Sequence, residues 1–475
     1  MVSANSADSP RLVVLGAGPG GYAAAFRAAD LGMQVTLIDS EPNPGGVCLY
    51  RGCIPSKALL HVAALIHETG RAAEWGVEFG APQIDLQRLR DWKEGVVSQL
   101  TGGLGMLSRA RKVEYLQGRG RFVDAHTLQV ALEGELTELR FDYSIVATGS
   151  SPVFPPALRL DSPLVMDSTA ALELESVPER LLVVGGGYIG LELGTVYGAL
   201  GSHVTVVEMT SGLLPGADRD LVEPLAARLG GEFEELMLDT RVTELAVAGD
   251  AVRAKLVGVD LDEERTFDRV LVAVGRTPNT AEIGLDTTNV QLGERGFIGT
   301  DQQRRTAEPS IFAIGDVAGE PMLAHKATHE GHVAAAAIAG RPTAFDPAAI
   351  PAVVFTDPEI AWCGLTETEA LNRGVDFEVL RFPWAASGRA ATIGRSEGFS
   401  KLIVDPRTER IMGVGIVGAG AGALIAEGTL AVEMGALASD LQLTIHPHPT
   451  LSETLMEAAE AFYGQSPHIY APKRP

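Results

Sequence analysis

Two stretches of the chain share one pattern of apolar and polar positions. Residues 11–40 and 180–209 align without a gap at a constant offset of 169. Each runs from an apolar strand through Gly-x-Gly-x-x-Gly and an Ala- or Leu-rich helix to a second apolar strand that ends in an acid. This order is typical of a dinucleotide-binding βαβ unit. One glycine motif alone would be weak evidence, but two complete copies in register predict two such units.

The glycines and the acid of each copy have separate expected tasks. The first glycine permits a tight turn, the second lets the backbone approach a pyrophosphate at the helix N-terminus, and the third lets the helix pack on the strand. The acid, 18 residues after the last glycine, can accept hydrogen bonds from ribose hydroxyls. The candidates are Gly16, Gly18, Gly21 and Asp39 in the first copy, and Gly185, Gly187, Gly190 and Glu208 in the second.

The second copy favours NAD over NADP. No Arg or Lys stands between Glu208 and Leu214. A 2′-phosphate would therefore meet a carboxylate with no nearby cation to receive it.

Two cysteines, Cys48 and Cys53, lie five positions apart in a segment that opens with Gly45 and ends in Pro-Ser-Lys57. On a regular helix this step rises about 7.5 Å, beyond the roughly 7 Å limit for bridging two Cα atoms. A disulfide therefore needs a distorted first turn, which Gly52 permits. A strained, accessible bridge suits thiol exchange, whereas the alternative is a pair of buried free thiols. Beside two dinucleotides, the dithiol predicts a relay from nicotinamide through flavin to disulfide.

Further apolar stretches surround the repeat. Residues 141–150 and 267–276 each predict a strand that ends in a small-residue turn, and residues 311–316 predict a strand that ends in Gly-Asp. The Ala-rich run at 334–339 predicts a core helix, and the Pro-containing stretch at 341–351 marks the boundary to a last domain. The second unit is expected as an insertion into the first.

The last domain carries a candidate proton carrier. Residues 446–453 read His-Pro-His-Pro-Thr-Leu-Ser-Glu. Disulfide–dithiol chemistry needs a group that titrates near neutrality, and histidine is the default. Glu453 could hold the far ring nitrogen of His448. Two plainer interpretations stay open: Thr450-x-x-Glu453 is also a helix capping box, which can coexist with catalysis, and His446 could be a hydrogen-bonded packing residue.

Composition narrows the class of protein. With 475 residues, 46% hydrophobic and 21% charged, the chain has the composition of a globular protein of several domains. A net charge of −23 disfavours nucleic acid, and no apolar stretch reaches the roughly 20 residues of a membrane span. Residues 1–10 lack the features of a signal or transit peptide. Three cysteines argue against a secreted disulfide framework. From these observations together we expect a cytoplasmic protein with no metal, nucleic-acid or membrane partner.

With these motifs assembled, the chain resembles the pyridine nucleotide–disulfide oxidoreductases over essentially its full length. Within them it is most similar to the members that serve bacterial 2-oxo acid dehydrogenase complexes. Besides the dithiol segment, the glycine motifs and residues 446–453, the resemblance rests on Glu192 and on residues 275–279, 315–316 and 322–326. It implies oxidation of protein-bound dihydrolipoamide to lipoamide, with FAD and NAD⁺ as cofactors and NADH as product.

The resemblance implies an α/β fold with two Rossmann-like dinucleotide-binding domains and a C-terminal α+β dimerisation domain. Residues 1–152 would form the first part of the FAD-binding domain, 153–274 the NAD-binding domain, 275–347 the second part of the FAD-binding domain, and 348–475 the dimerisation domain. The expected partners are a second copy of the chain and the lipoylated acyltransferase subunit of a 2-oxo acid dehydrogenase complex.

The same resemblance implies roles for single residues. Cys48 would exchange with substrate and Cys53 would contact the flavin, while His448, supported by Glu453, would reach the dithiol of the other subunit. Lys57 would lie near the flavin ring and pair with Glu192. The expected FAD residues are Gly16, Gly18, Gly21, Asp39, Gly46, Lys57, Gly120, Gly149, Asp316 and Ala324, and the expected NAD residues are Gly185, Gly187, Tyr188, Ile189, Gly190, Glu192, Glu208, Ala273, Gly275 and Arg276.

The chain departs from the family pattern at several positions. Asp39 replaces the usual glutamate, and Tyr50-Arg51 replaces the usual Asn-Val between the cysteines. We hypothesise that Arg51 stabilises a thiolate at Cys53. Tyr188 stands where dihydrolipoamide-oxidising members carry a small aliphatic residue, and a tyrosine there gates the nicotinamide pocket in glutathione reductases.

Two alternatives stay open at this point. An NADPH-dependent glutathione-type disulfide reductase would require cations near Glu208, and an electron-transfer flavoprotein without disulfide chemistry would show a broken set of relay residues. Mercuric reductases and large thioredoxin reductases carry extra C-terminal thiols, but no cysteine follows Cys363, which we expect to be a packed thiol.

Overall fold

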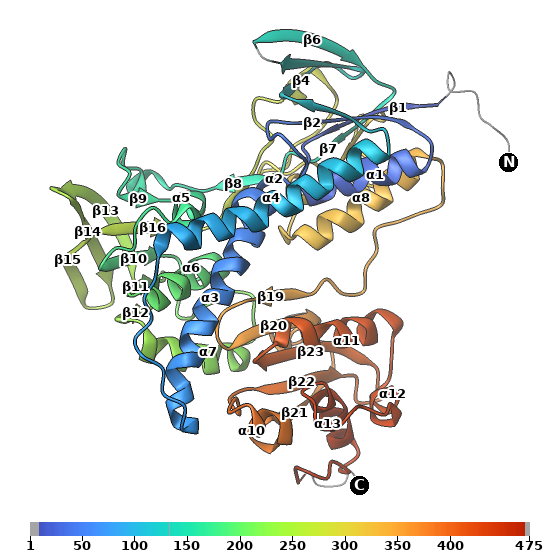
Figure 1. Ribbon diagram of the computed structural model, residues 1–475. Coiled ribbons are helices and arrows are strands. Elements are labelled where there is room, and N and C mark those ends of the chain that lie inside the picture. The colour runs from blue at the N-terminus through green and yellow to red at the C-terminus, as the bar shows by residue number, and fades with distance from the viewer. Residues whose placement is uncertain (1–8, 133, 471–475) are drawn as a thin grey trace.

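Three five-stranded sheets organise the chain (Figure 1). The structure is a computed structural model that describes residues 9–132 and 134–470. Of the N-terminal segment considered above for a targeting signal, residues 1–8 lie outside the described part. Two sheets are parallel and the third, near the C-terminus, is antiparallel. The predicted α/β fold with two Rossmann-like units and a C-terminal α+β domain is confirmed.

The first parallel sheet has the order β18-β7-β1-β2-β3. Its central strand β1 is apolar after Arg11 because both faces are covered: α1 and α8 pack on one face, and the sheet β4-β5-β6 packs on the other. A Cβ on Gly331 of α8 would lie 2.6 Å from the oxygen of Gly20, so glycine lets the two helices approach closely. The elements are β1 (Arg11–Leu15), α1 (Pro19–Asp30), β2 (Gln34–Asp39), β3 (Glu114–Gln117), β7 (Tyr143–Val146), β18 (Ile311–Ala313) and α8 (Ala324–Ile338), whose last turns hold the predicted Ala-rich run.

The second parallel sheet has the order β12-β11-β10-β16-β9. Its β10 (Arg180–Val184), α6 (Tyr188–Ala199) and β11 (His203–Val207) begin at the residues equivalent to β1, α1 and β2 in the repeat, so the internal repeat is confirmed. The other elements are β9 (Val165–Met166), α5 (Ser168–Glu173), α7 (Arg219–Glu232), β12 (Glu235–Met237) and β16 (Arg269–Val272).

Two antiparallel strands carry the chain between the parallel sheets. β8 (Ser150–Pro152) leads toward the second sheet and pairs with β17 (Arg276–Pro278), which leads back. All strands of the second sheet lie between them, as expected of an inserted unit; the boundaries at 152, 274 and 347 stay predictions. Each half also carries a three-stranded antiparallel sheet, formed by β4 (Arg119–Asp124), β5 (Thr127–Leu132) and β6 (Glu135–Arg140), and by β13 (Arg241–Ala248), β14 (Ala251–Gly258) and β15 (Leu261–Phe267).

The C-terminal sheet has the order β19-β20-β23-β22-β21. Helices α11 and α13 cover one face, where Cys363 is a buried thiol as predicted, and burial raises its pKa to about 11. The other face packs against α7 of the second unit. The elements are β19 (Ala352–Val354), β20 (Glu359–Gly364), α9 (Glu367–Arg373), β21 (Glu378–Pro383), α10 (Gly388–Thr392), β22 (Phe399–Val404), β23 (Ile411–Gly418), α11 (Ala421–Met434), α12 (Ala438–Leu443) and α13 (Glu453–Phe462).

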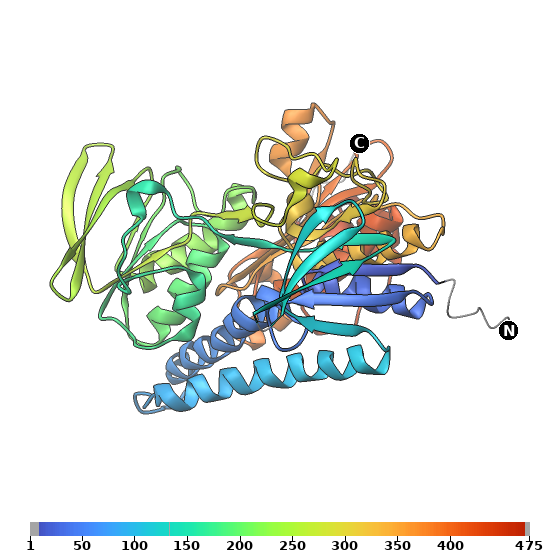
Figure 2. The same cartoon turned by 90° about the horizontal axis from the view of Figure 1, so that it is seen from above.

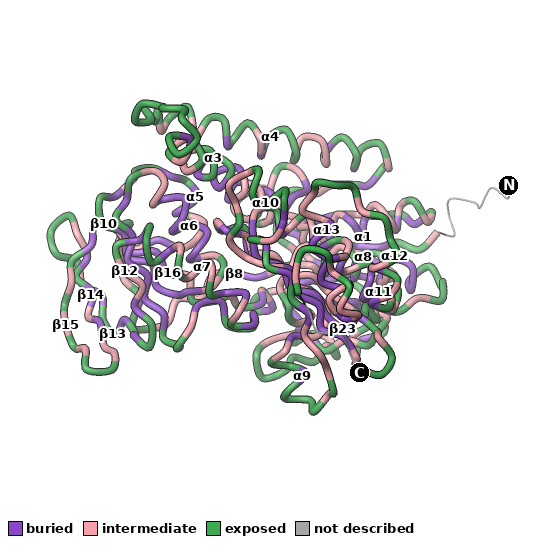
Figure 3. Tube along the Cα trace, turned by 90° about the horizontal axis from the view of Figure 1, so that it is seen from below, coloured by how far each residue is buried: buried purple, intermediate pink, exposed green. Residues whose placement is uncertain are grey.

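Two long helices lie against both the first and the second parallel unit. After the short α2 (Gly46–Arg51), α3 (Cys53–Arg71) packs on α6, and α4 (Leu86–Ala110) lies along α3 (Figure 2). Much of α4 is exposed, whereas the sheet strands are mostly buried (Figure 3). None of the described helices has the length and apolar character to cross a membrane. Short 3₁₀ segments complete the chain: η1 (Ala72–Trp75), η2 (Pro156–Leu158), η3 (Leu285–Thr287), η4 (Gly315–Ala318) and η5 (Trp384–Ala386).

Candidate active site

A cavity of about 480 Å³ lies at the carboxyl ends of β1, β7 and β18 and reaches the start of α6. Carboxyl ends of parallel strands are the usual place for a ligand in such folds. Both cysteines line the cavity, as do these predicted cofactor residues: Gly16, Gly18, Asp39, Gly46, Lys57, Gly149, Asp316, Ala324, Tyr188, Ile189, Glu192 and Arg276.

The remaining predicted residues lie outside that wall. Gly120 packs on β1, since a Cβ there would be 2.7 Å from Leu15 Cδ1, and its neighbour Arg119 lines the cavity instead. The other predicted residues that do not line the cavity are Gly21, Gly185, Gly187, Gly190, Glu208, Ala273, Gly275, His448 and Glu453.

The first glycine motif has the geometry expected of a phosphate-binding turn. Gly16 has a φ of +99°, and a Cβ on Gly21 would collide with the Gly16 oxygen, so the first glycine makes the turn and the third allows close packing. Gly18, at the N-terminus of α1, has open space beside it except for Gly46. A Cβ on Gly46 would collide with Gly18, so bare backbone from two segments meets at this wall. These groups fit the pyrophosphate of FAD at a helix N-terminus.

The acid of the first copy holds this loop in place. Asp39 Oδ2 accepts a hydrogen bond of 2.6 Å from the amide of Ala17, and its Oδ1 accepts one of 3.0 Å from the amide of Glu41. Because Asp39 also lines the cavity, a carboxylate with further acceptor capacity faces the site beside the glycine loop.

The second copy repeats this geometry. Gly185 has a φ of +111°, Gly187 has nothing within 4 Å of a built Cβ, and Glu208 Oε2 accepts a hydrogen bond of 2.7 Å from the amide of Gly186. Arg219 is the first arginine after the acid. It donates to the carbonyl oxygens of Leu213 at 2.7 Å, and to those of Leu214 and Ala217. This cation is therefore already engaged, which agrees with the preference for NAD.

The two cysteines lie at a break between two helices. Gly52 separates α2 from α3, and a Cβ there would be 2.9 Å from the oxygen of Val47, so the predicted distortion at Gly52 is confirmed. Both cysteines are thiols in this structure. A hydrogen bond from Cys48 and the charge of Lys57 lower the pKa of Cys53 to about 7, whereas the same hydrogen bond and burial raise the pKa of Cys48. The contacts around the pair therefore favour a thiolate at Cys53.

Arg51 is the residue that we hypothesised to stabilise a thiolate at Cys53. Its guanidinium is paired with Glu41, and the cation that lowers the pKa of Cys53 is Lys57. The pair with Glu41 therefore gives no support to thiolate stabilisation by Arg51, which stays a hypothesis.

Three regions of the chain meet around Lys57. Its Nζ lies 2.7 Å from Glu192 Oε2, and it stands 4.7 Å from the centroid of the Phe355 ring. The other oxygen of Glu192 accepts a hydrogen bond of 3.0 Å from the amide of Phe355. Glu192 is buried on α6, so one carboxylate links the second unit to α3 and to the C-terminal region. Nothing in the sequence pattern pointed to Phe355.

A second cluster surrounds Asp316. Ser150 donates a hydrogen bond of 2.5 Å to Asp316 Oδ2, and Arg276 Nε donates one of 2.7 Å to the same hydroxyl. A second nitrogen of the Arg276 guanidinium donates to the backbone carbonyl oxygen of Ser150 at 2.6 Å. Ser150 lies on β8 and Arg276 on β17, so the antiparallel pairing of these two strands positions the cluster. Sequence reasoning missed Ser150, which carried no motif of its own.

Tyr188 opens α6 and lines the cavity between the two glycine motifs. Its ring is partly exposed, and burial of the hydroxyl raises its pKa. The tyrosine therefore lines the cavity on the side of the second unit while part of its surface stays exposed.

The histidine segment forms two separate pairs. His448 Nδ1 lies 2.9 Å from Glu453 Oε2, and the imidazole is 66% exposed. Glu453 Oε1 also accepts from the amide of Thr450 at 3.4 Å, but α13 begins at Glu453 and the Thr450 hydroxyl instead donates to Pro447, so the reciprocal capping box is not formed. His446 is buried against Glu427 at 2.6 Å, as expected of a packing residue.

His448 and the dithiol lie in different parts of the chain. α13 sits in the C-terminal region, away from α2 and the start of α3 (Figure 1). His448 accordingly does not line the cavity of its own chain, as expected if it serves another subunit.

Comparison with known proteins gives full-length matches. A model of the pyridine nucleotide-disulphide oxidoreductase family matches residues 10–331, and a model of the family's dimerisation domain matches residues 350–459. The dihydrolipoyl dehydrogenase of Vibrio parahaemolyticus is 50% identical over 96% of both chains. That of Haemophilus influenzae is 49% identical over 96% of this chain and 95% of its own.

Two solved structures share the fold at lower identity. LpdA from Mycobacterium tuberculosis aligns with a TM-score of 0.88 at 28% identity, over 95% of this chain and 99% of that one. The HOCl-induced flavoprotein disulfide reductase RclA from Escherichia coli aligns with a TM-score of 0.84 at 28% identity, over 94% of this chain and 98% of that one.

Proposed function

This chain belongs to the pyridine nucleotide–disulphide oxidoreductases, and from that premise we propose that it oxidises protein-bound dihydrolipoamide to lipoamide and reduces NAD⁺ to NADH. The predicted family, the use of FAD and NAD, and the homodimer are confirmed by the family, its dimerisation domain and the relatives. Those relatives are dihydrolipoyl dehydrogenases, which favours this function over the glutathione-type and electron-transfer alternatives.

One observation carries the proposal. Cys48, Cys53, Lys57 and Glu192 line the same cavity as the glycine motif that fits the FAD pyrophosphate. An electron-transfer flavoprotein would have no use for a dithiol at this wall.

We assign Cys48 the exchange with substrate and Cys53 the contact with flavin. A thiolate of dihydrolipoamide attacks the Cys48 sulfur of the oxidised pair, which forms a mixed disulfide and releases Cys53 as a thiolate. The second substrate thiol then displaces Cys48, so lipoamide leaves with its disulfide closed and the protein holds two more electrons. The lowered pKa of Cys53 makes it the better leaving group of the pair.

His448 of the partner subunit would take the protons of the substrate thiols. Its bond to Glu453 engages one ring nitrogen, so that the other would be available to the dithiol. FAD, when bound, supplies the two-electron step between the dithiol and the nicotinamide. Lys57, Asp316 and Gly46 would hold it, and Tyr188 and Arg276 would border the nicotinamide.

The proposed substrate is a lipoyl group that is carried by a partner protein. We propose the lipoylated acyltransferase subunit of a 2-oxo acid dehydrogenase complex as that partner, and the cytoplasm as the place. We also propose domain boundaries at residues 152, 274 and 347.

The test is a turnover assay of the purified holoenzyme. NAD⁺ with dihydrolipoamide should give rapid growth of NADH absorbance, and NADP⁺ in its place should give little. Absence of turnover, together with NADPH-dependent reduction of glutathione disulfide, would instead assign the chain to the glutathione-type reductases.

A further inference from the structure

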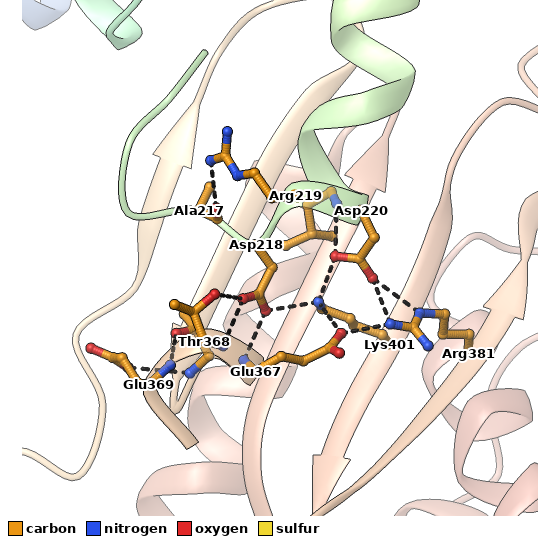
Figure 4. A network of polar contacts seen from close by, with 11 residues as sticks. Ala217, Asp218, Arg219, Asp220, Glu367, Thr368, Glu369, Arg381 and Lys401 are labelled. Atoms are coloured by element: carbon orange, nitrogen blue, oxygen red, sulfur yellow. Dashed lines mark hydrogen bonds and ion pairs between the residues drawn. The ribbon is translucent and has the colours of Figure 1, made fainter. Parts of the chain in front are cut away.

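A buried lysine joins the second parallel unit to the C-terminal sheet. Lys401 of β22 is 1% exposed, and its ammonium group lies 2.8 Å from Asp218, 2.8 Å from Asp220 and 2.7 Å from Glu367 (Figure 4). Three donors thus meet three carboxylates, and the hydrogen-bonding capacity of the ammonium is filled.

The carboxylates come from both sides of a domain junction. Asp218 and Asp220 stand at the start of α7 in the NAD-binding half, whereas Glu367 opens α9 in the dimerisation domain. Asp218 is the N-cap residue of α7 but does not cap that helix with its side chain. It accepts instead from the amides of Glu367 at 3.0 Å and Thr368 at 3.2 Å. The side chain of Asp218 therefore bonds to the N-terminus of α9 across the junction and not to the N-terminus of its own helix.

Electrostatics favour a fixed geometry at this site. Burial alone would raise the pKa of Asp218 and Asp220, but the hydrogen bonds and charge of Lys401 hold both below their usual range. Arg381 adds a second cation, 2.8 Å from Asp220 and 2.6 Å from Glu367. Buried ion clusters contribute little net stability compared with apolar packing, so their value lies in orientation.

The start of α7 is connected to the dinucleotide loop by direct contacts. Next to Asp218, Arg219 donates to the oxygens of Leu213 and Leu214. The amide of Leu214 donates to the oxygen of Gly186 at 2.9 Å, and a Cβ on Gly186 would be 2.7 Å from Leu213 Cδ2. Gly186 lies inside the second glycine motif, so a shift of α7 must move the loop that binds the NAD pyrophosphate.

We propose that Lys401 is a positioning residue for the nicotinamide: through Asp218 and Arg219 it fixes the glycine loop of the NAD-binding half against the dimerisation domain. This inference rests on the proposed function for its reaction, because the nicotinamide must face the flavin within hydride-transfer distance. A misplacement of about 1 Å can cost on the order of 100-fold in rate.

The experiment separates the two half-reactions in one protein. We would make Lys401→Met, the conservative Lys401→Arg, and a triple variant in which Lys401→Met is combined with Asp218→Asn and Asp220→Asn. Lys401→Met alone leaves three buried carboxylates without their cation and could fail to fold. The triple variant is the alternative in that case, because it also removes the negative charges of Asp218 and Asp220. Lys255→Met is the matched control, since Lys255 is a surface lysine of β14 that pairs with Asp262.

Flavin reduction is followed by anaerobic stopped flow, once with NADH and once with dihydrolipoamide. In Lys401→Met and the triple variant, reduction by NADH should slow by about tenfold or more, and NAD⁺ binding measured by calorimetry should weaken. Reduction by dihydrolipoamide should stay within about twofold of the wild type, because the dithiol wall does not include α7. Lys401→Arg should recover most of the NADH rate.

Equal slowing of both half-reactions would overturn the proposal, since it would mean a general structural role. Unchanged NADH reduction would overturn it as well. Failure of the proposed function itself has a different signature: dihydrolipoamide would not reduce the wild-type flavin at all, while the NADH arm would still report on Lys401.

Discussion

At the scale of single residues, the cavity is governed by pairs that are distant in sequence. Glu192 joins Lys57 to the amide of Phe355, and Ser150 joins Asp316 to Arg276. The sequence predicted the charged members because they belong to motifs. It did not predict Phe355 or Ser150, because their roles depend on which loops the tertiary fold brings together.

The thiolate at Cys53 should depend on the charge of Lys57. In Lys57→Met the pKa of Cys53 should rise from about 7 by about one unit or more, because a nearby cation favours the charged form. Thiolate would then form only at higher pH and be lost earlier as pH falls. The ultraviolet absorbance of the reduced protein, titrated against pH, measures this; Arg51→Val is the control and should leave the titration in place, because Arg51 is neutralised by Glu41.

Phe355 offers a subtler test at the same site. Phe355→Leu keeps the backbone amide that bonds to Glu192 but removes the aromatic face beside Lys57. We expect a loss of about 0.5–2 kcal/mol in the free energy of unfolding, the range for a cation–π contact plus lost ring packing. Denaturant unfolding of the holoenzyme measures it, and a variant as stable as the wild type would show that the ring contact contributes nothing.

At the scale of elements, the repeated βαβ pattern predicted strand and helix starts well because every signal agreed: apolar runs, glycines and acids. The C-terminal motif predicted less. Thr450 and Glu453 fit a capping box by spacing, yet the Thr450 hydroxyl donates to Pro447 and α13 starts later. A short local motif fails where one of its groups finds another partner, as the Thr450 hydroxyl does in the carbonyl oxygen of Pro447.

An open glycine of the repeat, Gly187, should respond differently from a packed glycine, Gly46. Gly187→Ala should leave the fold intact, since a Cβ there meets nothing within 4 Å, while weakening NAD⁺ binding because the methyl group occupies the approach of the pyrophosphate. Gly46→Ala should lower FAD retention, because its Cβ would collide with Gly18 and its φ is positive. Calorimetry with NAD⁺ and the flavin content after gel filtration distinguish the two; unchanged affinities in both variants would contradict the assigned loops.

Gly95 is a glycine inside a helix that has no turn or close contact to require it. Gly95 lies inside α4 with no atom within 4 Å of a built Cβ. Gly95→Ala should therefore raise the free energy of unfolding by about 0.5–1 kcal/mol. Thermal or denaturant unfolding beside the wild type checks the sign; destabilisation would indicate that α4 packs against another surface in the assembled protein.

At the scale of the whole molecule, one chain does not bring His448 to its own dithiol. Cys48→Ser and His448→Gln should each be inactive as pure dimers. In a hybrid dimer of the two, one site receives an intact Cys48 and an intact His448, so random reassembly should recover about a quarter of wild-type activity. Activity is measured after the two variants are unfolded together and refolded; a mixture that stays inactive would place the histidine and dithiol of one site on the same chain.

The antiparallel pairing of β8 with β17 has a mechanical consequence. The chain enters the second parallel unit through β8 and leaves it through β17, and these strands are hydrogen-bonded to each other. Two adjacent attachments of this kind form a ribbon hinge, so a swing of that unit would turn about Ser150 and Arg276. The same rotation would pull Glu192 from Lys57 and Asp218 from Lys401. Those two ion contacts would therefore both resist such a rotation.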